Sequence, residues 1–187
     1  MKTIKVLLLE DMSDDFSAIE NIIGEISNEL ATHQVKLELL YDYDSSLKLI
    51  SNFVASERML AQLQPPFKAV VSQMIAEIKA ESDLICLLDI VWTVDAKKKI
   101  EKTEKHDEYG CDFYCRYLNN GNAQTKKNTL IVSARSKKPN RMSNIELVPK
   151  LNNKVPFGDA FKTKLKSAIC ALPVVNITES SEEKGDT

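Results

Sequence analysis

Continuously apolar runs alternate with amphipathic stretches along the chain. Residues 4–9 (IKVLLL), 83–89 (DLICLLD) and 129–134 (TLIVSA) are almost wholly apolar, which is typical of strands buried on both faces of a parallel sheet. Two shorter runs, residues 35–41 (VKLELLY) and 145–148 (IELV), also have the composition of strands. The pattern therefore predicts five strands.

The stretches between these strands carry apolar residues three and four positions apart, as one face of a helix does. Asp14 or Asp15 is expected to cap the first helix, and Pro65 and Pro66 separate the second from the third, because proline disrupts a helix interior. The five helices are expected over residues 16–26, 45–63, 67–80, 109–118 and 157–172.

This alternation defines a fold class, because parallel strands need crossover connections and those crossovers are right-handed. The sequence predicts an α/β, flavodoxin-like fold: a five-stranded parallel sheet in the order 2-1-3-4-5 with helices on both faces. We expect one domain over residues 1–172 with a charge-dense insertion at 94–108. Residues 173–187 are polar and acidic and are expected to form a disordered tail.

The composition is that of an ordinary globular protein. The 187 residues are 43% hydrophobic and 28% charged, with a formal net charge of −2. No apolar run approaches the roughly 18 residues of a membrane span. The first apolar run meets Glu10 and Asp11 instead of a signal cleavage site, so we expect no membrane span and a cytoplasmic location.

Scarce residue types argue against several classes of site. The five glycines are too far apart to form a dinucleotide fingerprint or a Walker phosphate loop. The two histidines, His33 and His106, lie in polar surroundings, which disfavours a Ser-His-Asp triad. A local excess of lysine and arginine over residues 122–154 is interpreted as a solvated face, and nucleic-acid binding is not expected.

The residues that leave the predicted strands carry the candidate chemistry, because ligands of open α/β sheets bind beyond the carboxyl ends of the strands. In the order 2-1-3-4-5, the first and third strands are neighbours, so three carboxylates should crowd together and a hard cation such as Mg²⁺ could neutralise them. The strand-end residues are Glu10, Asp11, Asp89, Ser133 and Lys150.

A carboxylate in this position can attack phosphorus, and Asp89 is the natural nucleophile. Lys150 can pair with one phosphoryl oxygen as a point charge, and the Ser133 hydroxyl can donate to another. These three residues are the candidates for the reaction itself.

The run KVLLLED, the strand DLICLLD, the run TLIVSA and a lysine after the last strand together resemble the receiver domain of two-component response regulators. The resemblance spans roughly residues 3–171. It implies that Asp89 is the phosphorylated aspartate. It also implies that Glu10, Asp11, Asp89 and the backbone carbonyl of Val91 bind Mg²⁺.

The same resemblance assigns Ser133 as the switch hydroxyl and Lys150 as the lysine that faces the phosphate, with Lys154 as a competing alignment. It implies a stand-alone receiver that takes its phosphoryl group from a histidine kinase or phosphotransfer protein and signals to an unidentified downstream protein. Such a domain is a phosphoacceptor and is not counted as an enzyme. A homodimer is compatible with this interpretation.

Two alternatives stay open. A pseudo-receiver would keep the fold as an interaction module without phosphotransfer; it is suggested by the lack of proline and glycine soon after Asp89, by the insertion, and by Leu147, where receivers carry an aromatic residue. A Mg²⁺-dependent phosphohydrolase is disfavoured because it would need a second acid two residues after Asp89, where Val91 stands.

Overall fold

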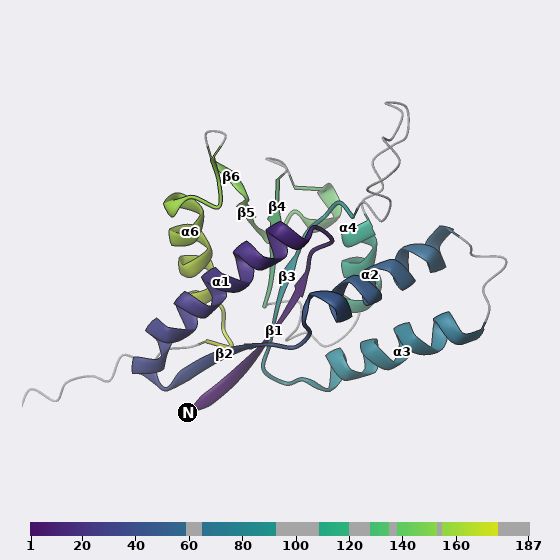
Figure 1. Ribbon diagram of the computed structural model, residues 1–187, viewed down its shortest axis with the longest axis horizontal. Coiled ribbons are helices and arrows are strands. Elements are labelled where there is room, and N and C mark those ends of the chain that lie inside the picture. Colours follow the sequence, from purple (N-terminus) through teal and green to yellow (C-terminus); the bar gives the residue numbers. More distant parts are fainter. Residues whose placement is uncertain (59–64, 93–108, 120–127, 135–137, 153–154, 176–187) are drawn as a thin grey trace, which may run out of the picture.

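The computed structural model describes residues 1–58, 65–92, 109–119, 128–134, 138–152 and 155–175. Its centre is one parallel sheet in the order β2-β1-β3-β4-β5, which confirms the predicted fold class (Figure 1). The five strands are β1 (Lys2–Leu9), β2 (Val35–Leu39), β3 (Leu84–Leu88), β4 (Thr129–Ser133) and β5 (Glu146–Pro149).

Strand register brings the ends of β1 and β3 to the same level. The two strands pair from Lys5 opposite Leu84 to Leu9 opposite Leu88. The ladder continues for one more hydrogen bond, since the backbone N–H of Asp89 donates to the Leu9 carbonyl at 3.0 Å. The residues that follow these two strands therefore leave the sheet side by side.

Helices cover both faces of the sheet, as the sequence predicts (Figure 1). Helices α1 and α6 pack on one face and share a core cluster. Helices α2, α3 and α4 pack on the other, and α4 continues as a single π-helical turn over Tyr114–Leu118. Their bounds are α1 (Ser13–Leu30), α2 (Tyr43–Arg58), α3 (Pro65–Ala80), α4 (Tyr109–Phe113) and α6 (Asp159–Cys170).

Two helices lie between β2 and β3, as predicted. Pro65 and Pro66 begin α3 instead of lying ahead of it. Proline is favoured in the first turn of a helix because the N–H that it lacks would have no partner there. The position of the helix start therefore differs from the prediction by two residues.

The connection from β4 to β5 is much shorter than the one from β2 to β3. Its described part carries only a 3-10 turn, Asn140–Met142. The Lys138 ammonium donates to the carbonyls of Ser143 (2.9 Å) and Ile145 (2.8 Å), which fixes the chain as it enters β5. In the described residues, the edge strand β5 is therefore reached through a turn, whereas the other crossovers contain helices.

A short antiparallel hairpin separates β5 from α6. Its strands are β6 (Leu151–Asn152) and β7 (Val155–Pro156), and the Phe157 N–H donates to the Lys150 carbonyl at 3.0 Å across its base. Phe157 has a left-handed φ of 53°. Its ring packs edge-on against Phe161 of α6 at 5.3 Å, so the hairpin base is anchored to the core.

The described fold continues to Val175. Val174 and Val175 are buried in the core beside α1 and α6, and the Lys2 ammonium donates to the Val174 carbonyl at 2.8 Å. The packed region thus extends past residue 172, where the sequence analysis ends the domain. The predicted insertion at 94–108 and residues 176–187 of the predicted tail lie outside the described residues. None of the described helices is both long enough and apolar enough to span a bilayer.

Candidate functional site

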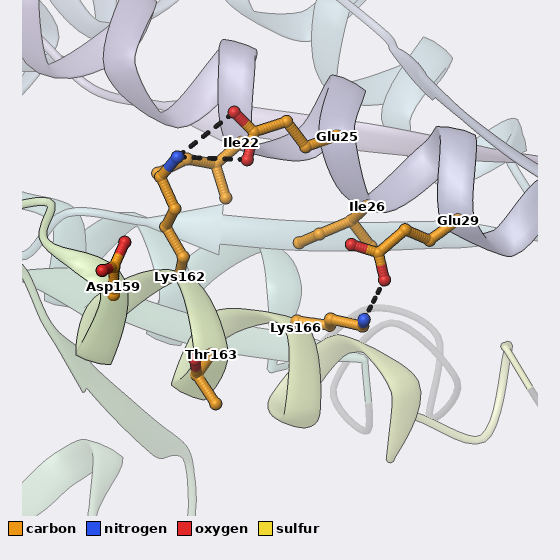
Figure 2. Close-up of a pocket in the computed structure, with 8 residues that line it drawn as sticks. All are labelled: Ile22, Glu25, Ile26, Glu29, Asp159, Lys162, Thr163 and Lys166. Carbon is orange, nitrogen blue, oxygen red and sulfur yellow. Dashed lines mark hydrogen bonds and ion pairs between the residues drawn. The ribbon is translucent and has the colours of Figure 1, made fainter.

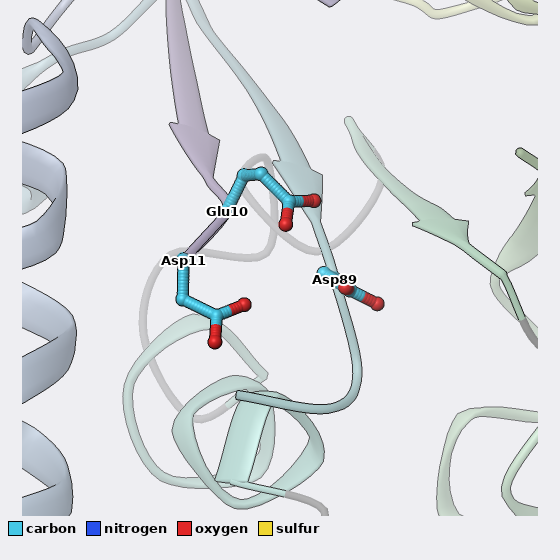
Figure 3. Close-up of side chains that lie close together, drawn as sticks. All are labelled: Glu10, Asp11 and Asp89. Carbon is cyan, nitrogen blue, oxygen red and sulfur yellow. The ribbon is translucent and has the colours of Figure 1, made fainter. Parts of the chain in front are cut away.

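Three carboxylates meet at the carboxyl ends of β1 and β3 (Figure 3). Glu10, Asp11 and Asp89 each offer an oxygen, and these atoms lie within 4.8 Å of one another. The residues are 1%, 8% and 8% exposed, respectively. Carboxylates this close and this buried repel one another, which makes the cluster a candidate cation site.

Backbone donors orient the carboxylates of Glu10 and Asp89, and a side-chain donor fixes the backbone at Asp11. The Met12 N–H donates to Glu10 Oε1 at 3.1 Å, and the Ile90 N–H donates to Asp89 Oδ1 at 2.7 Å. The Tyr43 hydroxyl donates to the Asp11 backbone carbonyl at 3.0 Å, which ties the start of α2 to the loop after β1. The acids are therefore held in place by the chain around them.

Lys150 contacts this cluster and is 3% exposed. Its ammonium donates to Glu10 Oε2, to Asp89 Oδ2 at 3.0 Å and to Asp15 Oδ2 at 2.9 Å. Its backbone N–H donates to the Ser133 carbonyl at 2.9 Å, because Lys150 directly follows β5. The structure brings together the predicted lysine and two of the predicted acids, whereas Lys154 lies outside the described residues.

Burial and neighbouring charges both shift the pKa values at the site. Burial raises the pKa of Glu10 to about 7, and the negative charge of Asp89 adds to the effect while Lys150 opposes it. Burial lowers the pKa of Lys150, but the charges of Asp89 and Glu10 outweigh it and the net shift is upward. The Lys150 ammonium contacts three carboxylates, and Asp11 adds a fourth to the site, so the site keeps an excess of negative charge that would attract a cation.

Asp15 is a member of the site that the sequence analysis missed. The prediction that Asp14 or Asp15 caps α1 is wrong, because Met12 occupies the N-cap position and both acids lie in the first turn. Asp15 turns toward the sheet and reaches Lys150. Lys150 is 135 residues away in the chain, so the sequence around Asp15 does not indicate this contact.

Gly110 is a second residue whose role the sequence did not reveal. A Cβ atom at this position would stand 2.0 Å from the Asp89 carbonyl oxygen, so only glycine fits. The Gly110 N–H also donates to the Ile90 carbonyl at 3.0 Å. Gly110 therefore lets the start of α4 lie directly against the backbone of Asp89 and Ile90.

Ser133 is buried at the end of β4, and it lies two residues past Ile131, the register partner of Leu88. It therefore stands near the level of Asp89 on the neighbouring strand. Its role as a switch hydroxyl stays a prediction, and so does the role of the Val91 carbonyl as a metal ligand. Val91 itself packs against the apolar core beside α2 and α4.

Trp92 connects the site to the core. It is 2% exposed, and its ring meets Phe53 edge-on at 5.9 Å and Phe113 at 5.7 Å. Its indole nitrogen has no hydrogen-bond partner among the described residues. A tryptophan three residues after Asp89 and packed between α2 and α4 can report changes at the site by fluorescence.

Neither the family models, nor the curated proteins, nor the solved structures with which the chain was compared match it. The interpretation of the site therefore depends on its geometry and on the resemblance in the sequence.

Proposed function

We propose that the protein is a stand-alone response-regulator receiver that accepts a phosphoryl group on Asp89 in the presence of Mg²⁺. One observation carries the proposal: Glu10, Asp11 and Asp89 meet within 4.8 Å at the carboxyl edge of the sheet, and Lys150 contacts two of them. The donor would be a histidine kinase or phosphotransfer protein. The output would be a contact with a downstream protein, and we expect the exchange to occur in the cytoplasm.

The donor set fits a magnesium ion. Mg²⁺ prefers oxygen ligands and is usually held by one or two carboxylates with several waters. The Asp11 and Asp89 carboxylates, supported by Glu10 and by the Val91 carbonyl, would hold it. The cation would supply positive charge beside the phosphoryl group and reduce its repulsion by the carboxylates.

Asp89 is the proposed phosphoacceptor. One carboxylate oxygen of Asp89 forms a bond to phosphorus while the bond from phosphorus to the donor histidine nitrogen breaks, and the leaving imidazole keeps the electron pair. The Ile90 N–H and the Lys150 ammonium fix the carboxylate from two sides. Lys150 then offers a charge to one phosphoryl oxygen, and the Ser133 hydroxyl is proposed to donate a hydrogen bond to another and so to signal the change.

Treatment with beryllofluoride, which mimics a phosphoryl group on aspartate, tests the proposal in the presence of Mg²⁺. We expect a shift in Trp92 fluorescence, a bound fluorine NMR signal, and a mass increase of one phosphoryl group when acetyl phosphate replaces beryllofluoride. Asp89→Asn should abolish all three responses. A wild-type protein that responds to neither reagent, or an Asp89→Asn variant that still responds, would refute the proposal.

A pseudo-receiver is the second candidate, and one observation favours it. Leu147, three residues before Lys150, is a half-buried aliphatic side chain that pairs with Ile131 in the sheet. An aliphatic residue there cannot relay a hydroxyl movement in the way an aromatic one does in receivers. In this case the wild-type protein would bind Mg²⁺ and fail to take up phosphoryl groups.

A further inference from the structure

The hydrogen-bonding capacity of Lys150 is fully used. A lysine ammonium has three N–H donors. In this structure they meet three carboxylates, from Glu10, Asp15 and Asp89. A phosphoryl oxygen that approaches Lys150 must therefore replace one of these partners.

The three partners differ in how easily they can be replaced. The side chains of Glu10 and Asp89 are 1% and 10% exposed, and each is also held by a backbone N–H. The Asp15 side chain is 32% exposed and lies in the first turn of α1. Water can solvate the Asp15 carboxylate once it leaves Lys150, whereas Glu10 would lose its counter-charge in a buried place.

We propose that Asp15 is a positioning residue that holds the Lys150 ammonium while Asp89 is unmodified and releases it to the phosphoryl group. This inference depends on the proposed phosphorylation of Asp89. Asp15 competes with the phosphoryl oxygen for one donor, so it opposes formation of the phosphorylated state. Removing the Asp15 carboxylate should therefore make the site bind a phosphoryl mimic more tightly.

Asp14 provides a matched control. It lies beside Asp15 in the first turn of α1, carries the same charge and is exposed to solvent. Asp14→Asn and Asp15→Asn therefore remove the same charge from the same helix start. Only Asp15→Asn removes a charge that contacts Lys150, which turns a charge-assisted hydrogen bond into a weaker neutral one.

The experiment is a beryllofluoride titration in Mg²⁺, followed by fluorine NMR, of the wild-type protein and both variants. We expect Asp15→Asn to bind beryllofluoride about fivefold more tightly, the size of one partly exposed charge-assisted hydrogen bond, and Asp14→Asn to stay near wild type. The difference should persist at high salt, which screens a long-range charge effect but leaves a direct contact. Asp15→Glu, which keeps a carboxylate on a longer stem, should return the affinity toward wild type.

Thermal unfolding of each variant separates this role from a purely structural one. Asp15→Ser serves as a second variant if Asp15→Asn fails to fold. Equal beryllofluoride affinity in Asp15→Asn and Asp14→Asn, or weaker affinity in Asp15→Asn, overturns the inference while the wild-type response upholds the receiver function. A wild-type protein that does not bind beryllofluoride refutes the receiver function and the inference with it.

Discussion

Lysines meet acids in several regions of the molecule, and two of these regions differ sharply in their surroundings. At the strand ends, Lys150 and Glu10 are 3% and 1% exposed. In the groove between α1 and α6, Lys162 meets Glu25 at 3.1 Å and Lys166 meets Glu29, with all four side chains 41–57% exposed (Figure 2). The same pairing of lysine with a carboxylate is thus buried at the strand ends and solvated in the groove.

Burial, more than the distance between the charges, decides how much each ion pair affects the stability of the fold. The groove between α1 and α6 is a hollow of about 300 Å³ whose walls include Ile22 and Ile26, and water reaches the charges above them. Water compensates the loss of either partner there. At the strand ends each charge is compensated only by its neighbours, so removing one leaves the others buried and unpaired.

Replacing one lysine in each region by methionine should give the largest difference in the free energy of unfolding. Lys150→Met should lower the free energy of unfolding by about 3–5 kcal/mol, because Glu10 and Asp89 lose their buried counter-charge. Lys162→Met should change it by no more than about 1 kcal/mol. Urea unfolding in the absence of Mg²⁺ measures both. Equal losses in the two variants would show that the environment of Lys150 is no different from a surface one.

Stability should depend on pH through Glu10. Its pKa in the folded protein is about 7 against an ordinary 4.5, so the folded state holds a proton that the unfolded state has released. The free energy of unfolding should therefore fall by about 3 kcal/mol as pH rises across this window. Glu10→Gln should remove that slope, and Mg²⁺ should reduce it by compensating the ionised carboxylate. Parallel pH profiles for wild type and Glu10→Gln would contradict this.

Two glycines extend the comparison to the backbone. Gly110→Ala places a methyl group against the Asp89 carbonyl and should cost about 1–3 kcal/mol of stability. Gly24 lies inside α1 with nothing within 4 Å of its Cβ position, so Gly24→Ala should add about 0.5–1 kcal/mol. Thermal unfolding of both variants should give shifts of opposite sign. A neutral Gly110→Ala would mean that the contact with Asp89 relaxes without cost.

The smallest effect should come from the groove itself. Glu25→Gln combined with Glu29→Gln should lower stability by no more than about 1 kcal/mol at low salt, and less at high salt, because exposed pairs are screened. Denaturant titrations at two salt concentrations measure the change. A larger loss that salt does not reduce would show that these pairs support the packing of α6 on α1.

Local sequence predicts the strands well because buried parallel strands are apolar on both faces. The run over residues 83–89 predicts β3 and places an acid at its exit, and Lys150 could be preferred over Lys154 because it directly follows the last strand. Those inferences need only the order of elements. The crowding of Glu10, Asp11 and Asp89 follows once β1 and β3 are neighbours.

The parts that sequence did not predict depend on contacts between distant segments. Asp15 resembles any acid in a first helical turn until the fold brings Lys150 beside it. Gly110 stands 21 positions after Asp89, so its contact with the Asp89 carbonyl cannot be deduced from spacing. The sequence analysis places no helix between the fourth and fifth strands, and the described part of that connection carries only a 3-10 turn.

The hydrogen bond between the Gly110 N–H and the Ile90 carbonyl ties the start of α4 to the residue directly after Asp89. Gly110 also lies directly against the Asp89 carbonyl, with no room for a side chain between them. The start of α4 therefore cannot shift relative to Asp89 without disturbing a backbone contact, which couples the position of this helix to that of the acid.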